Sequence, residues 1–499
     1  MNVHRISSFP LIIRADVFTG FTLVLISLFL LLTGDIANGQ SAHDHHHDQG
    51  SSHSHSHNED NATSHTGGQN HTHRPVDYSF NSDSIQYDTP VADDEGYYWW
   101  KGNLHTHTLW SDGDQFPEVV SQWYYKNGYN FLSISDHNVV LRGENWINLE
   151  TNPNAQSGGG MDIYDVYREK FGDDWIETRE VDGELEVRLK PLSEVSPLFE
   201  EAGRFLMINA EEITEPEHTI HVNATNILDL IEPEAGETVE ETIRLNIDAV
   251  VEQREQTGQD MIAHLNHPNF RKVVTAEDMF PVENLRLFEI YNGHRGVLNF
   301  GEEDGTKDLD RVWDIILTKR LGELDLNPVY GVAVDDGHHY EGSASHTARP
   351  GRGWVKVRTR YLTPEHIVRA LESGNFYGST GVDIADVSSD GKKYSVTIEP
   401  EDGVGYMIRF IGTREGYDPS SEPYIDEDGQ VRDDRTRLYS NEVGETLKEI
   451  NGNKATYEFE GDELYVRVKI ISTKLKENYF IEGEVEKAWL QPLIPGQEY

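Results

Sequence analysis

Histidine side chains are concentrated in one part of this sequence, where they could act as metal ligands. Apart from His4 and a histidine-rich tract near the N-terminus, twelve histidines remain, and eleven of them lie between His105 and His346. The chain contains no cysteine, which excludes disulfides and thiolate zinc sites and leaves imidazoles and carboxylates as metal ligands. The sequence therefore predicts a metal centre with nitrogen and oxygen ligands before about residue 346.

The candidate ligands recur at the ends of predicted strands. Residues two apart in a strand point to the same side, so His105 and His107 can bind one ion, and Asp112 follows on a turn. The candidates in or just after later strands are His137, Glu211, Glu212, His218, His221, His264, His267, Asp335, Asp336, His338 and His339. So many carboxylates and imidazoles at one rim would be costly unless cations held them. This pattern favours a metal site over isolated surface histidines.

Two kinds of hydrophobic pattern divide the chain. Between about residues 96 and 380, short apolar runs alternate with helical periodicity, which predicts an α/β barrel or open sheet. Strands are expected at 102–107, 129–135, 205–210, 219–226, 260–265, 285–291 and 329–334, and helices at 117–126, 239–255, 307–319 and 364–371. Segment 146–195 fits neither pattern and is expected to be a surface excursion. Residues 381–499 show strand alternation with turns, which predicts a small all-β, sandwich-like domain.

The N-terminal region carries targeting features. An uncharged apolar run from Val17 to Gly34 follows Arg5 and Arg14, which predicts a signal peptide at 1–39 or, alternatively, an uncleaved membrane anchor. Residues 40–95 are expected to be a disordered leader, with ten histidines between 41 and 74 that either capture metal or merely belong to a solvated linker. Either way the rest of the chain is expected outside the cytoplasm, secreted or periplasmic, or tethered to the membrane only through this segment.

The overall charge restricts the partners. The 499 residues include 42 Lys and Arg against 88 Asp and Glu, a formal net charge of −46, while 36% hydrophobic residues are enough to build cores. Such a field repels phosphate backbones, so binding of long nucleic acid is not expected. A small anionic substrate would have to be held by local cations or metal ions. Oligomeric state is not indicated.

The ordered motifs LHTHTLWSDG, ISDHN, AEEIT, HTIH, HLNHPN and VDDGHH resemble those of the polymerase and histidinol phosphatase (PHP) family of metal-dependent phosphoesterases, over about residues 98–345. The resemblance implies a distorted (β/α)7 barrel that binds two or three Mn, Zn or Fe ions. Asp112 stands where many relatives have a third histidine. In this detail the chain looks like the branch that hydrolyses small phosphate esters or nucleotides, and like extracytoplasmic metallohydrolases associated with carbamates or aryl esters.

Carried over position by position, the resemblance implies three sets of metal ligands. The first ion would be held by His105, His107, Glu212 and Asp336. Glu212 would bridge to a second ion held by His221 and His267, and a third would be held by Asp112, His137 and His338. Three choices stay open at this point: Glu211 competes with Glu212, His264 with His267, and Asp335 and His339 with Asp336 and His338.

These residues predict a metal-dependent hydrolase. Clustered ions lower the pKa of a bound water and supply a metal-bound hydroxide, so no side-chain nucleophile is needed. Asp136 is expected to orient a ligand histidine, and His294, with Asn292, to position substrate or protonate a leaving group. Distal phosphate is expected to bind some of the cations Arg142, Arg271, Lys272 and Arg295.

Three functions remain open on the sequence alone. A phosphoesterase acting on small phosphate esters or nucleotides is favoured. A hydrolase of carboxylic esters, carbamates or amides would use the same ions, and an extracellular metal-binding protein without catalysis would need no substrate.

Overall fold

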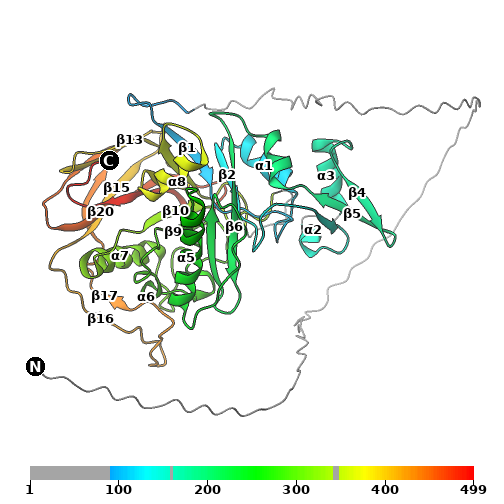
Figure 1. Cartoon of the computed structure of the whole chain (residues 1–499). Helices are drawn as coiled ribbons and strands as arrows, with labels where there is room; N and C mark the ends of the chain where they lie inside the picture. The colour runs from blue at the N-terminus through cyan, green and yellow to red at the C-terminus, as the bar shows by residue number, and fades with distance from the viewer. Residues whose placement is uncertain (1–89, 158–160, 341–347) are drawn as a thin grey trace, which may run out of the picture. The chain divides into compact units, whose positions relative to one another are not determined.

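The computed structural model describes residues 90–499, with gaps at 158–160 and 341–347 (Figure 1). The predicted signal peptide and nearly all of the predicted leader therefore lie outside the described residues. Within the described ranges, none of the helices combines the length and the apolar character needed to cross a membrane.

A large mixed sheet organises the described chain. Its 13 strands run in the order β10-β9-β8-β7-β6-β2-β1-β11-β12-β21-β20-β15-β18. The first seven correspond to the seven strands expected in the α/β region: β1 (Tyr98–Asn103), β2 (Phe131–Ile134), β6 (Leu206–Glu215), β7 (Ile220–Thr225), β8 (Ile262–Leu265), β9 (Leu287–Asn292) and β10 (Tyr330–Val334). The sheet continues through β11 (Trp354–Thr359), β12 (Phe376–Ser379), β21 (Val485–Leu493), β20 (Glu463–Leu475), β15 (Tyr406–Arg414) and β18 (Glu445–Asn451). The protein is thus a mixed α/β protein built around one long sheet.

The strand directions depart from simple β/α alternation. Strands β1, β2 and β6 are parallel, as are β8, β9 and β10, but β7 runs antiparallel to both of its neighbours. Strand β1 begins at Tyr98 and ends at Asn103, so His105 and His107 follow this strand and do not lie in it as expected. A single parallel bridge joins Thr106 to Gly337, beyond the ends of β1 and β10.

Four helices lie where the periodicity predicts them: α1 (Pro117–Lys126), α5 (Val239–Thr257), α7 (Leu309–Lys319) and α8 (Pro364–Glu372). The short helix α6 (Ala276–Met279) was not predicted. Local chemistry sets their ends: the Thr238 side chain accepts from Glu241 N at the start of α5, and Gly258 ends that helix at φ 73°. Helix α5 packs on β7 and β8, and α7 packs on β9.

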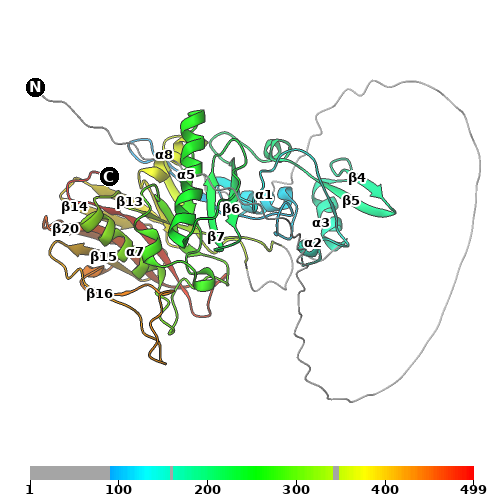
Figure 2. The ribbon, with the colours of Figure 1, turned by 60° about the horizontal axis from the view of Figure 1, so that its bottom comes forward.

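The insertion, defined here as residues 145–195, is more than a surface loop. It contains β3 (Asn145–Asn148), α2 (Pro153–Ser157), α3 (Met161–Phe171), β4 (Thr178–Val181), β5 (Glu184–Leu189) and α4 (Leu192–Val195), with the strands in the order β3-β5-β4. Figures 1 and 2 show it beside α1. Buried insertion residues such as Ile147 and Tyr167 share one apolar cluster with Leu109 and Val120. The insertion is therefore anchored to the segment that carries Asp112.

The C-terminal region is rich in strands, as expected. Besides its strands in the large sheet it has β13 (Ile384–Ser389), β14 (Lys393–Ile398) and β19 (Lys454–Glu458) in a second sheet, and a small pair, β16 (Ser421–Glu422) and β17 (Leu438–Tyr439). Strand β12 pairs with β21, so the large sheet crosses the position near residue 380 where a domain boundary is predicted. Buried Arg467 of β20 also pairs with Asp314 of α7 at 2.7 Å. That boundary stays a prediction.

Candidate metal centre

The segments that follow β1 and β10 lie against each other and place several candidate ligands together. His107 N donates to Gly337 O at 3.0 Å, and Asp336 N donates to His105 O at 3.1 Å. These backbone bonds fix the histidines after β1 beside the aspartate after β10. Loops at the carboxyl ends of strands are where α/β proteins build functional sites.

A first group of donor atoms comes from His105, His107, Glu212 and Asp336. His105 Nε2 lies 3.0 Å from His107 Nε2, and Glu212 Oε2 lies 3.3 Å from each of these nitrogens. Asp336 Oδ1 is 3.4 Å from His105 Nε2 and 3.3 Å from His107 Nε2. Donor atoms about 2.1 Å from a tetrahedrally coordinated ion lie about 3.4 Å apart. Within this first group, His105, His107 and Asp336 form a compact triad whose spacing fits a single divalent cation, and Glu212 Oε2 lies beside both imidazoles.

His221 and His267 lie around the other carboxylate oxygen of Glu212 and are called the second group here; the compact triads are His137, Glu212 and His221, and His105, Glu212 and His267. Glu212 Oε1 lies 2.8 Å from His221 Nδ1 and 3.4 Å from His267 Nε2, and it accepts a hydrogen bond from Asn266 Nδ2 at 2.7 Å. Its Oε2 is buried and accepts no hydrogen bond from the described residues, although three imidazole nitrogens lie 2.9 to 3.3 Å away. A buried carboxylate oxygen in this situation fits a cation as its missing partner.

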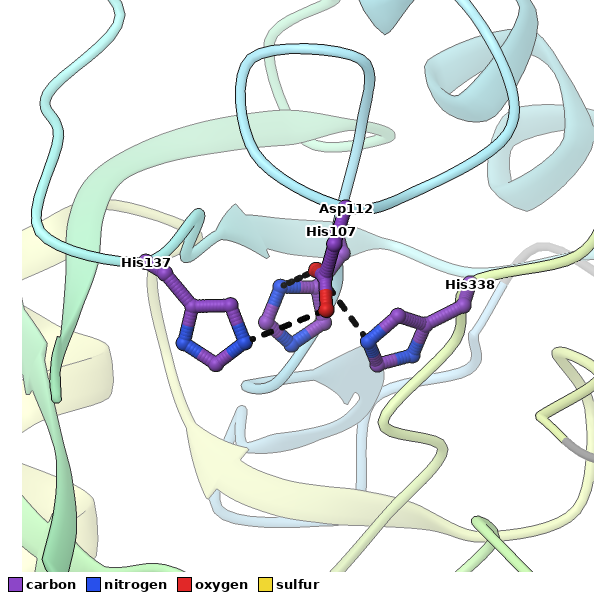
Figure 3. A group of neighbouring side chains, drawn as sticks. All are labelled: His107, Asp112, His137 and His338. Carbon is purple, nitrogen blue, oxygen red and sulfur yellow. Dashed lines mark ion pairs between the residues drawn. The ribbon is translucent and has the colours of Figure 1, made fainter. Parts of the chain in front are cut away.

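A third group surrounds Asp112 (Figure 3). The carboxylate oxygens of Asp112 lie 3.3 Å from His107 Nδ1, 3.4 Å from His137 Nε2 and 3.3 Å from His338 Nε2. His107 thus faces the first group with Nε2 and the third group with Nδ1, a sharing that the sequence does not reveal. A neutral imidazole has one nitrogen lone pair that can bind a metal and one N–H proton. His107 can therefore bind only one of the two ions unless it also loses this N–H proton.

The charges within the cluster reinforce one another. Burial works against the charged forms, but His105, His137 and their neighbours hold the pKa of Glu212 well below its usual range. Burial is likewise outweighed at His338, where Asp112 raises the pKa to about 9, and at His137, where Glu212 raises it to about 11. The carboxylates therefore stay ionised and need compensating positive charge, which protons or cations can provide.

Two candidate ligands have strained backbones. Asp336 has φ 50° and His267 has φ 25°, in the left-handed region that non-glycine residues rarely adopt. Such conformations cost about 1–3 kcal/mol each and cluster at functional sites. The strain is consistent with backbones held in place to aim these side chains.

Side-chain direction separates the residues that compete in the sequence. Glu211 and Glu212 are neighbours in β6 and so face opposite sides. Glu211 Oε1 accepts from Ile231 N at 2.7 Å, and burial raises the pKa of Glu211 to about 8. Glu211 is thereby placed away from the donor groups, whereas Glu212 lies among them.

The other two pairs of competing residues also have different neighbours. His264 Nε2 lies 3.4 Å from Glu289 Oε1 in a donor group with His105 and Glu289, whereas His267 lies in a donor group with His105 and Glu212. Asp335 Oδ1 accepts from the backbone amides of Arg352 and Gly353 at 2.7 and 2.9 Å. The donor groups contain Asp336 and His338, while His339 is absent from those found among the described residues.

Glu289 is a buried residue of β9 that the sequence analysis did not single out. Its Oε1 lies 2.6 Å from His105 Nδ1, and its Oε2 accepts from His267 N at 2.7 Å and from Asn292 Nδ2 at 2.8 Å. A carboxylate on the far nitrogen of a ligand histidine fixes its tautomer and ring orientation. The feature of the sequence that could have indicated Glu289 is a glutamate inside the otherwise apolar strand LFEIYN.

Replacing Glu289 with glutamine is expected to lower hydrolysis by about 10- to 100-fold, because His105 loses the carboxylate that orients it. Steady-state rates at saturating Mn²⁺ measure this effect. Glu118→Gln is the matched control, since Glu118 is also fully buried but bonds to Tyr167 and Trp175. Equal loss of rate in the two variants would contradict a specific role for Glu289.

Asp136 supports a loop and does not contact a ligand ring directly. Its Oδ1 accepts from Thr108 N at 2.8 Å and from Ser111 Oγ at 2.6 Å, and its Oδ2 accepts from Thr108 Oγ1 at 2.7 Å. Ser111 Oγ in turn lies 3.4 Å from His107 Nδ1. Burial raises the pKa of Asp136 to about 6. The expected orientation of a histidine by Asp136 can thus act through Ser111 or through the backbone of Thr108, the residue after His107.

A pocket of about 350 Å³ opens over the three groups. It is lined by Asp112, His137, Glu212, Thr214, Glu215, Pro216, Thr219, His221, His267, Phe270, Arg271, His294, Asp336 and His338. Of the four cations expected to bind phosphate, Arg271 is the one among the described lining residues. Lys272 is paired with Glu302 and Asp304, Arg142 is paired with Asp229, and Arg295 is exposed outside the lining.

His294 lies in the pocket wall as a neutral donor. Burial lowers the pKa of His294 to about 4, and its Nδ1 accepts from Gly296 N at 3.1 Å. The proton of the neutral ring therefore resides on Nε2. The expected role of Arg295 at the same loop has no support from this geometry, because its side chain does not line the pocket.

Comparisons with known proteins give weak similarities. No family model matches the chain, and no curated protein sequence matches it. One similar solved structure is a two-domain protein from Bacteroides vulgatus containing a predicted PHP-like metal-dependent phosphoesterase, with 15% identity over 77% of this chain and 94% of that one, at a TM-score of 0.33. Another is a candidate metal-dependent phosphoesterase from Bifidobacterium adolescentis, with 13% identity over 50% of this chain and 92% of that one, at a TM-score of 0.23. The arrangement of the side chains has to carry any functional conclusion.

Proposed function

We propose that this chain is a metal-dependent hydrolase that acts on small phosphate esters. The observation that carries the proposal is the convergence of imidazole and carboxylate donors at 3.0 to 3.4 Å around Glu212, whose buried Oε2 accepts no hydrogen bond from the described residues. This donor set suits divalent Mn, Zn or Fe. When bound, such ions supply a water of lowered pKa and polarise a phosphoryl oxygen.

The residues of the pocket have separate tasks in this proposal. Glu212 holds two donor groups together, because its two carboxylate oxygens face different histidines. Arg271 offers the guanidinium that binds phosphoryl oxygens. His294, as a neutral ring, offers its Nε2–H as a hydrogen-bond donor that can orient a substrate oxygen.

A closed, distorted barrel is part of the same proposal. Seven strands are neighbours in the order β10-β9-β8-β7-β6-β2-β1, and the Thr106–Gly337 bridge joins the segments beyond the two outer strands. Strand β1 pairs with β11 on its other edge, so the Thr106–Gly337 bridge is the contact that supports this part of the proposal. It brings the segment with His105 and His107 to the segment with Asp336.

A substrate panel tests the proposed chemistry. The full chain, loaded with Mn²⁺, is assayed on phosphate monoesters, phosphodiesters, nucleotides, aryl esters and carbamates. We expect turnover of small phosphate esters that depends on Mn²⁺. If only aryl esters or carbamates are turned over, the protein is a hydrolase of carboxyl derivatives and not of phosphate esters. If the protein binds Mn²⁺ without any turnover, a metal-binding function is favoured.

Arg271→Ala is expected to raise KM for a phosphate ester by about 10- to 100-fold, with a smaller change in kcat. Hydrogen bonds to charged groups contribute about 1.5–3 kcal/mol, and the lost guanidinium binds substrate and transition state alike. Arg271 and Lys272 both have positive φ, 52° and 61°, and the ion pairs of Lys272 hold this strained turn. Steady-state kinetics measure the effect, with Arg295→Ala as the exposed control. An unchanged KM would exclude Arg271 from substrate binding.

A further inference from the structure

The insertion contacts the loop that carries Asp112 at two places. This Asp112 loop, residues 108–114, includes Ser111, whose carbonyl oxygen accepts a hydrogen bond from Asn154 Nδ2 at 2.7 Å. Trp110 Nε1 donates to Lys190 O of the insertion at 3.1 Å, in a buried contact. Both bonds reach residues directly before Asp112, so the insertion holds the loop on two sides.

The Asp112 loop needs such support because it belongs to no helix or strand. Its internal backbone bonds run to Thr108 O from Ser111 N at 3.1 Å and from Gly113 N at 3.0 Å, and Trp110 N and Ser111 Oγ donate to Thr108 Oγ1 and Asp112 Oδ1. Asp136 holds Thr108 and Ser111, and the insertion adds the contacts at Trp110 and Ser111. Asp112 has a side chain that is 44% exposed, whereas that of His107 in the same donor group is 0% exposed. An exposed carboxylate on a loop has more freedom to move than donors fixed behind strands.

The same loop is tied to another donor of the third group. Asp114 N donates to His338 O at 2.8 Å. At Gly113, a Cβ atom would lie 2.6 Å from the carbonyl carbon and oxygen of His107, so the loop also packs closely on that residue. Its position relative to His107 and His338 therefore determines whether the donors of the third group converge.

We propose that the insertion sets the affinity of the third group for its cation, with Asn154 as a positioning residue that acts on Asp112 through the Ser111 carbonyl. The inference rests on the proposed function, because it requires a cation at the third group. The first and second groups use donors that follow β1, β8 and β10 or lie in β6 and β7. Loss of the Asn154 contact should accordingly affect one ion and spare the others.

Two neighbouring amides of α2 provide a matched pair of variants. Asn154 Nδ2 donates to Ser111 O of the Asp112 loop, while Gln156 Nε2 donates to Leu149 O inside the insertion at 2.6 Å. Asn154→Leu and Gln156→Leu each remove one amide-to-carbonyl bond from the same helix. Only the first removes a contact with the loop.

Mn²⁺ titration of the full chain, with free Mn²⁺ read from its EPR signal, measures the effect. Asp112→Asn first identifies the ion that depends on Asp112, and the histidine-rich leader contributes the same background to every variant. Asn154→Leu is expected to lower the Mn²⁺ affinity of that site by about tenfold or more and to leave the affinity of the other sites unchanged. Gln156→Leu is expected to bind Mn²⁺ like the wild type. Trp110→Phe keeps a smaller aromatic ring but loses the Nε1 donor, and it is expected to weaken binding of the same ion.

Three results would overturn the inference. Asn154→Leu and Gln156→Leu could bind Mn²⁺ equally, or Asn154→Leu could lower the Mn²⁺ affinity of every site by the same factor. The wild type could also bind no ion whose affinity depends on Asp112. Thermal unfolding of the two leucine variants checks that their folds are equally affected. A different result would contradict the proposed function: a wild-type chain that binds Mn²⁺ but hydrolyses no ester.

Discussion

We expect Glu212→Gln to abolish the proposed hydrolysis and to remove bound metal. The Glu212 carboxylate faces donors of two groups, with Oε2 at 3.3 Å from His105 and His107 and Oε1 at 2.8 Å from His221. Glutamine keeps the shape but loses the negative charge that both ions require. Since loss of groups that only orient ligands costs about 10- to 100-fold, loss of a direct ligand shared by two ions should lower the rate by more than about 100-fold.

The adjacent residue of β6 provides the control for this variant. Glu211 is also buried, but its carboxylate accepts from Ile231 N on the other side of the strand. Glu211→Gln should therefore keep the metal content and most of the rate. Initial rates and elemental analysis of both variants decide the matter. A Glu212→Gln protein with wild-type turnover would refute the assignment of Glu212 as a ligand.

Removing the divalent ions with a chelator is expected to abolish turnover and to lower the Tm by several degrees, both restored by Mn²⁺. An ion at a hundred times its Kd stabilises the folded state by about 2.7 kcal/mol, because it binds the folded chain and not the unfolded one. Without cations, the negative charge of the carboxylates is balanced by protons on His137 and His338 and no longer by an ion bound directly to the carboxylate oxygens. Calorimetry and rate assays on chelated and reloaded protein measure the two effects.

Two outcomes of the chelation experiment would contradict this prediction. Turnover that persists after complete removal of metal would exclude ion-dependent hydrolysis. A Tm that stays unchanged while the protein loses its metal would mean that the lost ions came from outside the folded donor groups. The Glu212→Gln protein is the control, since its Tm should respond much less to the chelator.

Local patterns predict the elements of the α/β region well. Helix 117–126 is expected at its observed bounds because Pro117 can occupy the first turn and apolar residues follow at helical spacing. Strands β8 and β10 coincide closely with short apolar runs followed by His267 and Asp336. Because strand ends can be recognised locally, the donor residues near them could be predicted before their distances were known.

Features that depend on long-range contacts could not be predicted in this way. The pairing of β12 with β21 joins residues more than one hundred positions apart, and no local pattern encodes it. Glu289 was missed because a charged residue in an apolar strand is informative only when its partner His105 is known. The support of the Asp112 loop by Asn154 likewise depends on how the insertion packs.

Binding of divalent cations by Glu212 and the surrounding imidazoles can be tested directly with crystals of the full chain grown with Mn²⁺, with diffraction recorded at the manganese absorption edge. We expect anomalous peaks in contact with His105, Glu212 and Asp336 and with His221 and His267. Ordered Mn²⁺ found only elsewhere, with these side chains hydrogen-bonded to one another or to water, would contradict this expectation.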